Sequence, residues 1–129
     1  MSVQRETVTA EGAPAAIGPY SHAVRAGGLL FCSGQIPLDP ADGEIVGETP
    51  AEQAERCLLN LKAVCEAAGT SLDSAVRLTV YMTDLSAFAE VNEIYGSFFA
   101  DVEPPARVAI GVAALPKGAQ VEIDAVVAL

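Results

Sequence analysis

Two charged side chains in this sequence stand in otherwise apolar segments, and their chemistry is complementary. Arg107 follows Pro105-Ala106 and opens an apolar segment, so its guanidinium could face a cleft at a strand end and bind a carboxylate through two parallel hydrogen bonds. Glu122 alternates with apolar residues, and its carboxylate could orient a water molecule beside that cation. The alternatives are a surface or subunit ion pair for Arg107, and a solvated strand face shared with Asp124 for Glu122.

The uncharged candidates lie in three other segments. Tyr20 follows Gly18-Pro19, which could fix its ring and hydroxyl at the mouth of a cleft; packing at an edge is the alternative. Ser33-Gly34 ends an apolar segment, and a glycine there permits close approach of the backbone to a ligand or to another strand. Asn92 lies beside an aromatic stripe, where its amide faces either a ligand or solvent. His22 is the only histidine, and because nothing nearby orients it, we expect it to be non-catalytic.

The cysteine count and the absence of familiar motifs exclude much ordinary enzymology. Cys32, Cys57 and Cys65 form neither a CxxC pair nor an even framework, and with one histidine they make no familiar zinc site. We expect three buried thiols, and Cys32 lacks a base that would make it a nucleophile. There is no glycine-rich phosphate loop, no dinucleotide fingerprint and no Ser/His/Asp order. The sequence therefore predicts no metal and no cofactor.

The net charge restricts the partners. Seven Lys and Arg residues stand against 17 Asp and Glu residues, which gives a net charge of −10. Such a field repels phosphate backbones and anionic lipid, and no basic patch offsets it, so we expect neither nucleic-acid nor membrane binding. No uncharged stretch is longer than residues 26–38, and because polar residues and glycines interrupt that stretch, it falls short of a membrane span. The N-terminus has no signal-peptide core, and we expect a cytoplasmic protein with one domain over residues 1–129.

The hydrophobic pattern predicts five strands and two helices. Short or alternating apolar segments indicate strands at 23–25, 29–33, 76–82, from Arg107 onward, and 120–127. Thr49, Pro50 and Glu52 have the chemistry of a helix start, and Gly69 is a natural stop for that helix. Asp84 or Ser86 caps a second helix with an aromatic-rich stripe.

This order of elements favours an α+β fold, with two helices on one face of a mixed sheet. The other face of the sheet must then be covered by something outside this chain. With glycine counted and tyrosine left out, the apolar share is about 57%, against a typical ~45–50%. The excess suggests that apolar surface is buried between subunits.

Four groups of motifs together resemble one known family, the RidA/YjgF enamine/imine deaminases. They occur in family order and spacing over almost the whole chain: Ile17-Gly18-Pro19-Tyr20-Ser21, Ser33-Gly34-Gln35-Ile36-Pro37, Phe88-Ala89-Glu90-Val91-Asn92-Glu93-Ile94-Tyr95, and Pro105-Ala106-Arg107 through Leu115-Pro116-Lys117-Gly118 to Val121-Glu122-Ile123. The resemblance implies a chorismate-mutase-like fold of the bacillus type. It also implies a homotrimer whose sheets form a central barrel with ligand clefts between subunits.

The resemblance further implies a reaction, the hydrolysis of 2-iminoacids such as 2-iminobutanoate or 2-iminopropanoate, or of their enamine tautomers, to 2-oxoacids and ammonia. By position, Arg107 would bind the substrate carboxylate, Glu122 would hold the attacking water, and Tyr20 would line the cleft. The Ser33-Gly34 backbone and Asn92 would shape the pocket. Such a reaction needs a positioned substrate carboxylate and one oriented water molecule.

One position departs from the family pattern. Many members carry a cysteine or a hydroxyl-bearing residue two positions after the arginine, where this chain has Ala109, so a thiol is excluded there. A second hypothesis is a non-catalytic or chaperone-like trimer that binds 2-oxoacids in the same clefts. A third, a nuclease or translation inhibitor, is opposed by the net charge of −10.

Overall fold

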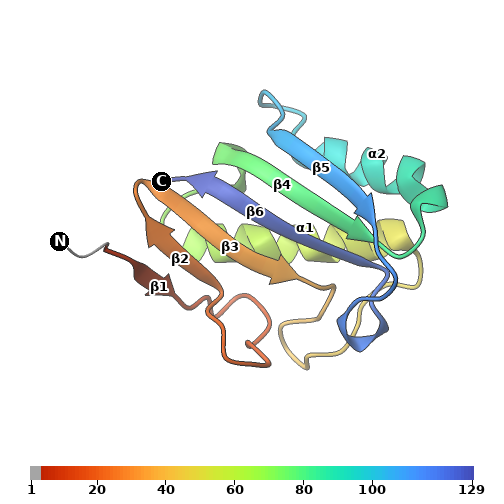
Figure 1. The fold of residues 1–129 in the computed structure, drawn as a ribbon, viewed down its shortest axis with the longest axis horizontal. Coiled ribbons are helices and arrows are strands. Elements are labelled where there is room, and N and C mark those ends of the chain that lie inside the picture. The colour runs from red at the N-terminus through yellow and green to blue at the C-terminus, as the bar shows by residue number, and fades with distance from the viewer. Residues whose placement is uncertain (1–3) are drawn as a thin grey trace.

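The computed structural model describes residues 4–129, which form a mixed six-stranded sheet with two long helices on one of its faces (Figure 1). The strands are β1 (Glu6–Val8), β2 (Ala23–Ala26), β3 (Leu29–Gln35), β4 (Ala75–Met82), β5 (Ala106–Gly111) and β6 (Val121–Ala128). Their order across the sheet is β1-β2-β3-β6-β4-β5, with β4 and β5 parallel and the other neighbours antiparallel. The helices are α1 (Pro50–Ala67) and α2 (Phe88–Phe98). The predicted α+β class is confirmed.

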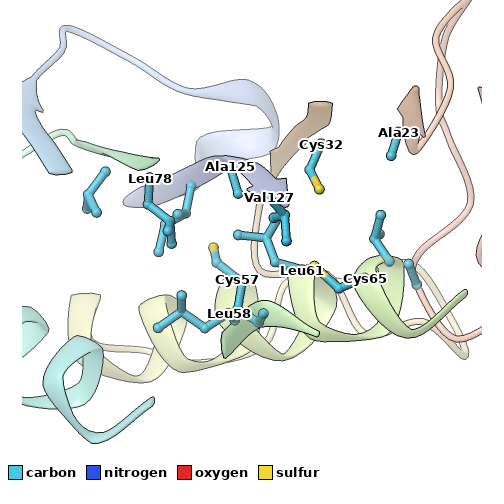
Figure 2. Packing of buried hydrophobic residues seen from close by; sticks show 14 of the residues in the cluster. Ala23, Cys32, Cys57, Leu58, Leu61, Cys65, Leu78, Ala125 and Val127 are labelled. Atoms are coloured by element: carbon cyan, nitrogen blue, oxygen red, sulfur yellow. The ribbon is translucent and has the colours of Figure 1, made fainter. Parts of the chain in front are cut away.

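Helix α1 begins and ends where the sequence predicts. The backbone N–H of Glu52 donates to Oγ1 of Thr49 at 3.2 Å, and the N–H of Thr49 donates to the Glu52 carboxylate at 3.1 Å, so two donors of the first turn are satisfied. Gly69 follows the helix with a φ of +83°, a backbone conformation that glycine adopts without strain. The apolar stripe of α1 packs against the sheet (Figure 2) and buries Leu58 and Leu61 completely.

The strands present one buried face and one open face. Leu78, Val80 and Met82 of β4 are buried under the helices, as the alternation predicts. Val76 belongs to the same alternation but is 47% exposed, because the pairing of β4 with β6 shifts register between Ala75 and Arg77. No described helix covers the other face (Figure 1). Large apolar side chains lie exposed on that face. Phe31 and Ile110 are 47% and 40% exposed there. The expectation that this chain leaves one sheet face uncovered is confirmed.

The three cysteines are free and buried, as expected. Figure 2 shows them in the core between α1 and the sheet. Burial raises the pKa of Cys57, and a hydrogen bond with Cys65 together with burial raises the pKa of Cys32. Cys32 and Cys57 therefore stay protonated at neutral pH, which makes them poor nucleophiles.

The structure differs from the sequence prediction at two further places. Strand β1 lies before residue 23, where the hydrophobic pattern predicts no strand; it pairs with β2, and Glu6 forms an ion pair with Arg25. Only Val8 of this strand is buried, so its apolar pattern is too short to indicate a strand. Asp84 accepts a hydrogen bond from the Ser86 N–H at 2.9 Å, but it caps a short 3₁₀ turn, and α2 begins only at Phe88.

None of the helices in residues 4–129 combines the length and the apolar character that crossing a membrane requires.

Candidate functional site

A cavity of about 320 Å³ opens where β3 leaves the sheet. Its walls come from the segment before β2, from the end of β3 and the residues after it, from the 3₁₀ turn before β6, and from the start of β6. The lining residues are Pro14, Ala15, Ile17, Tyr20, Ser33, Gly34, Gln35, Ile36, Leu38, Pro116 and Glu122. Most of these side chains are apolar, and Glu122 supplies the one carboxylate among them. A mostly apolar cavity with a few convergent polar groups is the usual form of a small-molecule site.

The Glu122 carboxylate occupies space that Gly34 leaves free. A side-chain carbon on Gly34 would overlap Oε2 of Glu122 and lie 3.0 Å from its Cδ. Because Gly34 has no side chain, the Glu122 side chain of the neighbouring strand β6 can lie close to its backbone. Burial, with a smaller contribution from the negative charge of Asp124, raises the pKa of Glu122 above its ordinary value.

Tyr20 and Ser33 lie at the same cavity. Tyr20 is 45% exposed, and its hydroxyl accepts a hydrogen bond from the Ile17 N–H at 3.4 Å. The Ser33 hydroxyl donates to the Ser21 carbonyl at 2.6 Å, and the Ser33 N–H donates to the His22 carbonyl at 3.0 Å. Ser33 thus ties the segment before β2 to the end of β3, beside Gly34.

Arg107 lies elsewhere, on the edge strand β5, against helix α2. Its Nη1 donates to Oδ1 of Asn92 at 2.7 Å, and its Cζ lies 5.1 Å from the centre of the Phe88 ring and 4.9 Å from that of Tyr95. We call Phe88, Asn92 and Tyr95 the Arg107 cradle. Within residues 4–129, no carboxylate forms an ion pair with Arg107, and its side chain is exposed.

The register of the sheet separates these two groups of residues. Arg107 is the partner of Leu78, whose side chain is buried on the helix-covered face. Glu122 is the partner of Tyr81, on the opposite face. One chain therefore brings Tyr20, Ser33 and Gly34 to Glu122, and it brings Asn92 to Arg107. Within one chain, the carboxylate does not lie beside the guanidinium.

The structure adds residues that sequence reasoning missed. Phe88 and Tyr95 belong to the aromatic-rich stripe predicted for this helix, and their rings lie against the guanidinium. The signal in the sequence is their spacing from Asn92, four and three residues, which puts all three on one helix face. His22 is buried, and its ring bonds to backbone groups on both sides. Among residues 4–129, no three His, Cys, Asp or Glu side chains gather as metal ligands would.

Comparisons with known proteins agree with this fold. The model of the family described as Endoribonuclease L-PSP matches residues 10–129. A RutC family protein of Sinorhizobium fredii is 52% identical, over 96% of this chain and 98% of its own length. The 2-iminobutanoate/2-iminopropanoate deaminase of the mouse is 43% identical, over 97% of this chain and 92% of its own length.

Two solved structures superpose over nearly the whole chain. RidA from the Antarctic bacterium Psychrobacter has a TM-score of 0.91 and 44% identity, and covers 96% of this chain and 99% of its own. Escherichia coli TdcF with bound serine has a TM-score of 0.91 and 40% identity, and covers 96% and 98%. Fold and sequence thus define one class of small α+β proteins. The chain belongs to the RidA/YjgF family of reactive-intermediate deaminases, as its motifs predicted.

Proposed function

We propose that this protein hydrolyses 2-iminoacids, and enamines through their imine tautomers, to 2-oxoacids and ammonia. Water adds to the imine carbon, the carbon–nitrogen bond breaks, and the nitrogen leaves as ammonia. 2-Iminobutanoate and 2-iminopropanoate are the expected substrates. The names of the mouse deaminase and of RidA support this reaction class.

The observation that carries the proposal is the Glu122 carboxylate, set into an apolar cavity opposite Gly34. A carboxylate with a raised pKa can orient a water molecule, accept its proton as it attacks, and return a proton to the departing nitrogen. Tyr20 and the Ser33-Gly34 backbone line the same space, which leaves room for a small side chain on the substrate.

Arg107 is the proposed partner of the substrate carboxylate. The cradle holds its guanidinium between two aromatic rings and engages Nη1 through the Asn92 amide. A guanidinium has five N–H donors, so donors remain for a second, bidentate contact with an acid group. The serine bound to TdcF, itself a small carboxylate, is consistent with such a ligand.

Because Arg107 and Glu122 lie on opposite faces of one sheet, the proposed site is completed between copies of the chain. The β5 edge of one copy would bring its Arg107 to the Glu122 cavity of the next. We propose a homotrimer, in which the open faces of three sheets cover one another; the exposed Phe31, Val108 and Ile110 on that face support this. Light scattering should give a mass of about three times 13.3 kDa.

The test generates 2-iminobutanoate in situ with an amino-acid dehydratase and follows 2-oxobutanoate release. Wild type accelerates the release. Arg107→Ala does not, and Arg107→Lys loses about tenfold or more, because an ammonium cannot make the bidentate contact. Arg5→Ala removes one arginine outside both groups of residues and keeps the wild-type rate. Equal rates with and without wild-type protein would exclude the deaminase.

The serine-bound relative also favours the alternative, a non-catalytic protein that binds 2-oxoacids in the same clefts. The same assay separates the two, because a binding protein would show a melting shift with 2-oxobutanoate but no turnover. Degradation of RNA, which the family description names, would require a polyanion to approach a chain of net charge −10; incubation with RNA at low salt tests it directly.

A further inference from the structure

The buried imidazole of His22 connects two backbone groups of the segment that walls the Glu122 cavity. Its Nδ1 accepts a hydrogen bond from the Ala10 N–H at 2.8 Å, and its Nε2 lies 2.7 Å from the Pro14 carbonyl oxygen. A backbone N–H can only donate and a carbonyl can only accept. The partners therefore fix the neutral tautomer with the proton on Nε2.

The segment that His22 holds is a partition between two cavities. Ala15 and Tyr20 line the Glu122 cavity, and they also line a second cavity of about 380 Å³, which the His22 ring borders. The His22 ring does not itself line the Glu122 cavity. Its backbone carbonyl accepts the hydrogen bond from Ser33, beside Gly34. His22 thus connects two parts of the cavity wall: its ring bonds to Ala10 and Pro14, and its backbone carbonyl bonds to Ser33 of β3.

We propose that His22 is a positioning residue: through both ring nitrogens it keeps the segment 10–20 closed as the wall of the Glu122 cavity, so that Tyr20 stays at the cavity mouth. The ring touches neither of the proposed reacting groups. This inference rests on the proposed function for its effect on rate, but its structural part is testable without substrate.

Variants at this position separate the two hydrogen bonds. His22→Asn places its side-chain oxygen near the Nδ1 position and keeps the acceptor for Ala10, whereas His22→Gln places an N–H near Nε2 and keeps the donor to Pro14. His22→Ala removes both. Hydrogen exchange of the backbone amides, followed on the ligand-free protein, reports how tightly segment 10–20 is held.

We expect His22→Ala to speed exchange in segment 10–20 by about tenfold or more, which corresponds to ~1.4 kcal/mol, with no change in the core amides of α1. His22→Asn should restore protection of the Ala10 amide, and His22→Gln should not. Because the chain has one histidine, a nitrogen-15 spectrum of the imidazole shows a single ring, and it should show the Nε2–H tautomer.

In the deaminase assay, the rate should fall in His22→Ala and recover in part in His22→Asn. Unchanged exchange in segment 10–20, or an equal rise over the whole chain, would overturn the proposal, and so would the Nδ1–H tautomer. A loosened segment with a wild-type rate would also overturn the positioning role. A wild-type protein without turnover would instead remove the proposed function, while the exchange data would still decide what holds the segment.

Discussion

The Glu122 carboxylate occupies the space that a side chain on Gly34 would fill, because a side-chain carbon there would overlap Oε2 of Glu122. Gly34→Ala should therefore push the carboxylate aside, and a displacement of about 1 Å costs on the order of 10²-fold in rate. The imine deaminase assay measures this loss. Thermal unfolding should change little, because the end of the Glu122 side chain can move.

Gly96→Ala is the matched control for that substitution. A side-chain carbon on Gly96, within α2, meets nothing within 4 Å. This change should keep the wild-type rate and raise stability by about 0.5–1 kcal/mol, because alanine favours a helix. If Gly34→Ala retained full activity, Glu122 would not be the group that holds the water.

The cradle predicts an unusual result at Asn92. Its amide oxygen accepts from Arg107 at 2.7 Å, so Asn92→Asp puts a carboxylate in the same place and forms an ion pair that competes with the substrate carboxylate. We expect Asn92→Asp to lower the rate and the affinity for 2-oxobutanoate severalfold more than Asn92→Ala does. The difference between the Asp and Ala variants should become smaller in high salt, because salt screens exposed ion pairs. An Asp variant as active as the Ala variant would contradict the carboxylate-binding role.

The raised pKa of Glu122 predicts the acid side of the pH profile. The proposed reaction requires the ionised carboxylate of Glu122, so kcat/KM should fall as pH drops through a midpoint above the ordinary Glu value of about 4.3. Asp124→Asn removes a neighbouring negative charge and should move that midpoint to lower pH. A pH–rate profile of both proteins measures the shift, and a midpoint that stayed in place would assign the acid limb to another group.

The same pKa has a consequence for stability. Because the folded pKa of Glu122 lies above the unfolded one, its stabilising contribution is full below about pH 4.3 and is lost as pH rises through the raised value. Glu122→Gln should therefore melt higher than wild type at pH 7, and the difference should shrink towards pH 4. Melting curves at the two pH values test this sign.

The open face of the sheet predicts how the proposed trimer can be broken. Ile110 is 40% exposed in the single chain, so Ile110→Glu should leave the chain folded but place a charge where another copy would pack. Its mass in solution should fall to that of one chain, and its deaminase activity should disappear. Val46→Glu is the control, since Val46 is 38% exposed in the loop between β3 and α1, outside every strand of the sheet. A trimeric Ile110→Glu protein would refute packing through this face.

Mixed assemblies test whether one site draws on two chains. Arg107→Ala and Glu122→Gln proteins should each be inactive. Unfolded together in equal amounts and refolded, they should recover about a quarter of the wild-type rate, because about a quarter of the clefts then join an intact guanidinium to an intact carboxylate. The refolded mixture is compared with each variant refolded alone. Failure to recover any rate, with trimers present, would mean that both groups act from the same chain.

Local chemistry made much of the fold predictable from the sequence. The Thr49–Glu52 capping pair and the alternation from Leu78 to Met82 in β4 act over a few residues, and both are confirmed. Val76 departs from that alternation because the pairing of β4 with β6 shifts register between Ala75 and Arg77. Strand β1 was missed because it depends on pairing with β2, a contact between distant residues that its own three residues do not signal. The start of α2 was placed too early because Asp84 caps a short 3₁₀ turn first.

For the site, the sequence supplied candidate residues but did not indicate which of them lie together. Tyr20, Ser33, Gly34 and Glu122 share one cavity, and Arg107 and Asn92 share a hydrogen bond. That these two groups lie on opposite faces follows from strand order and register, which connect residues far apart in the chain. The bonds of His22 were missed for the same reason, since its partners lie 12 and 8 residues away.

Because the proposed catalytic groups lie on two faces of the sheet, activity would require the association of chains. A single folded chain would be inactive, so the rate per chain should fall sharply on dilution below the concentration at which the proposed trimers dissociate. Cellular abundance would then act as a threshold for activity.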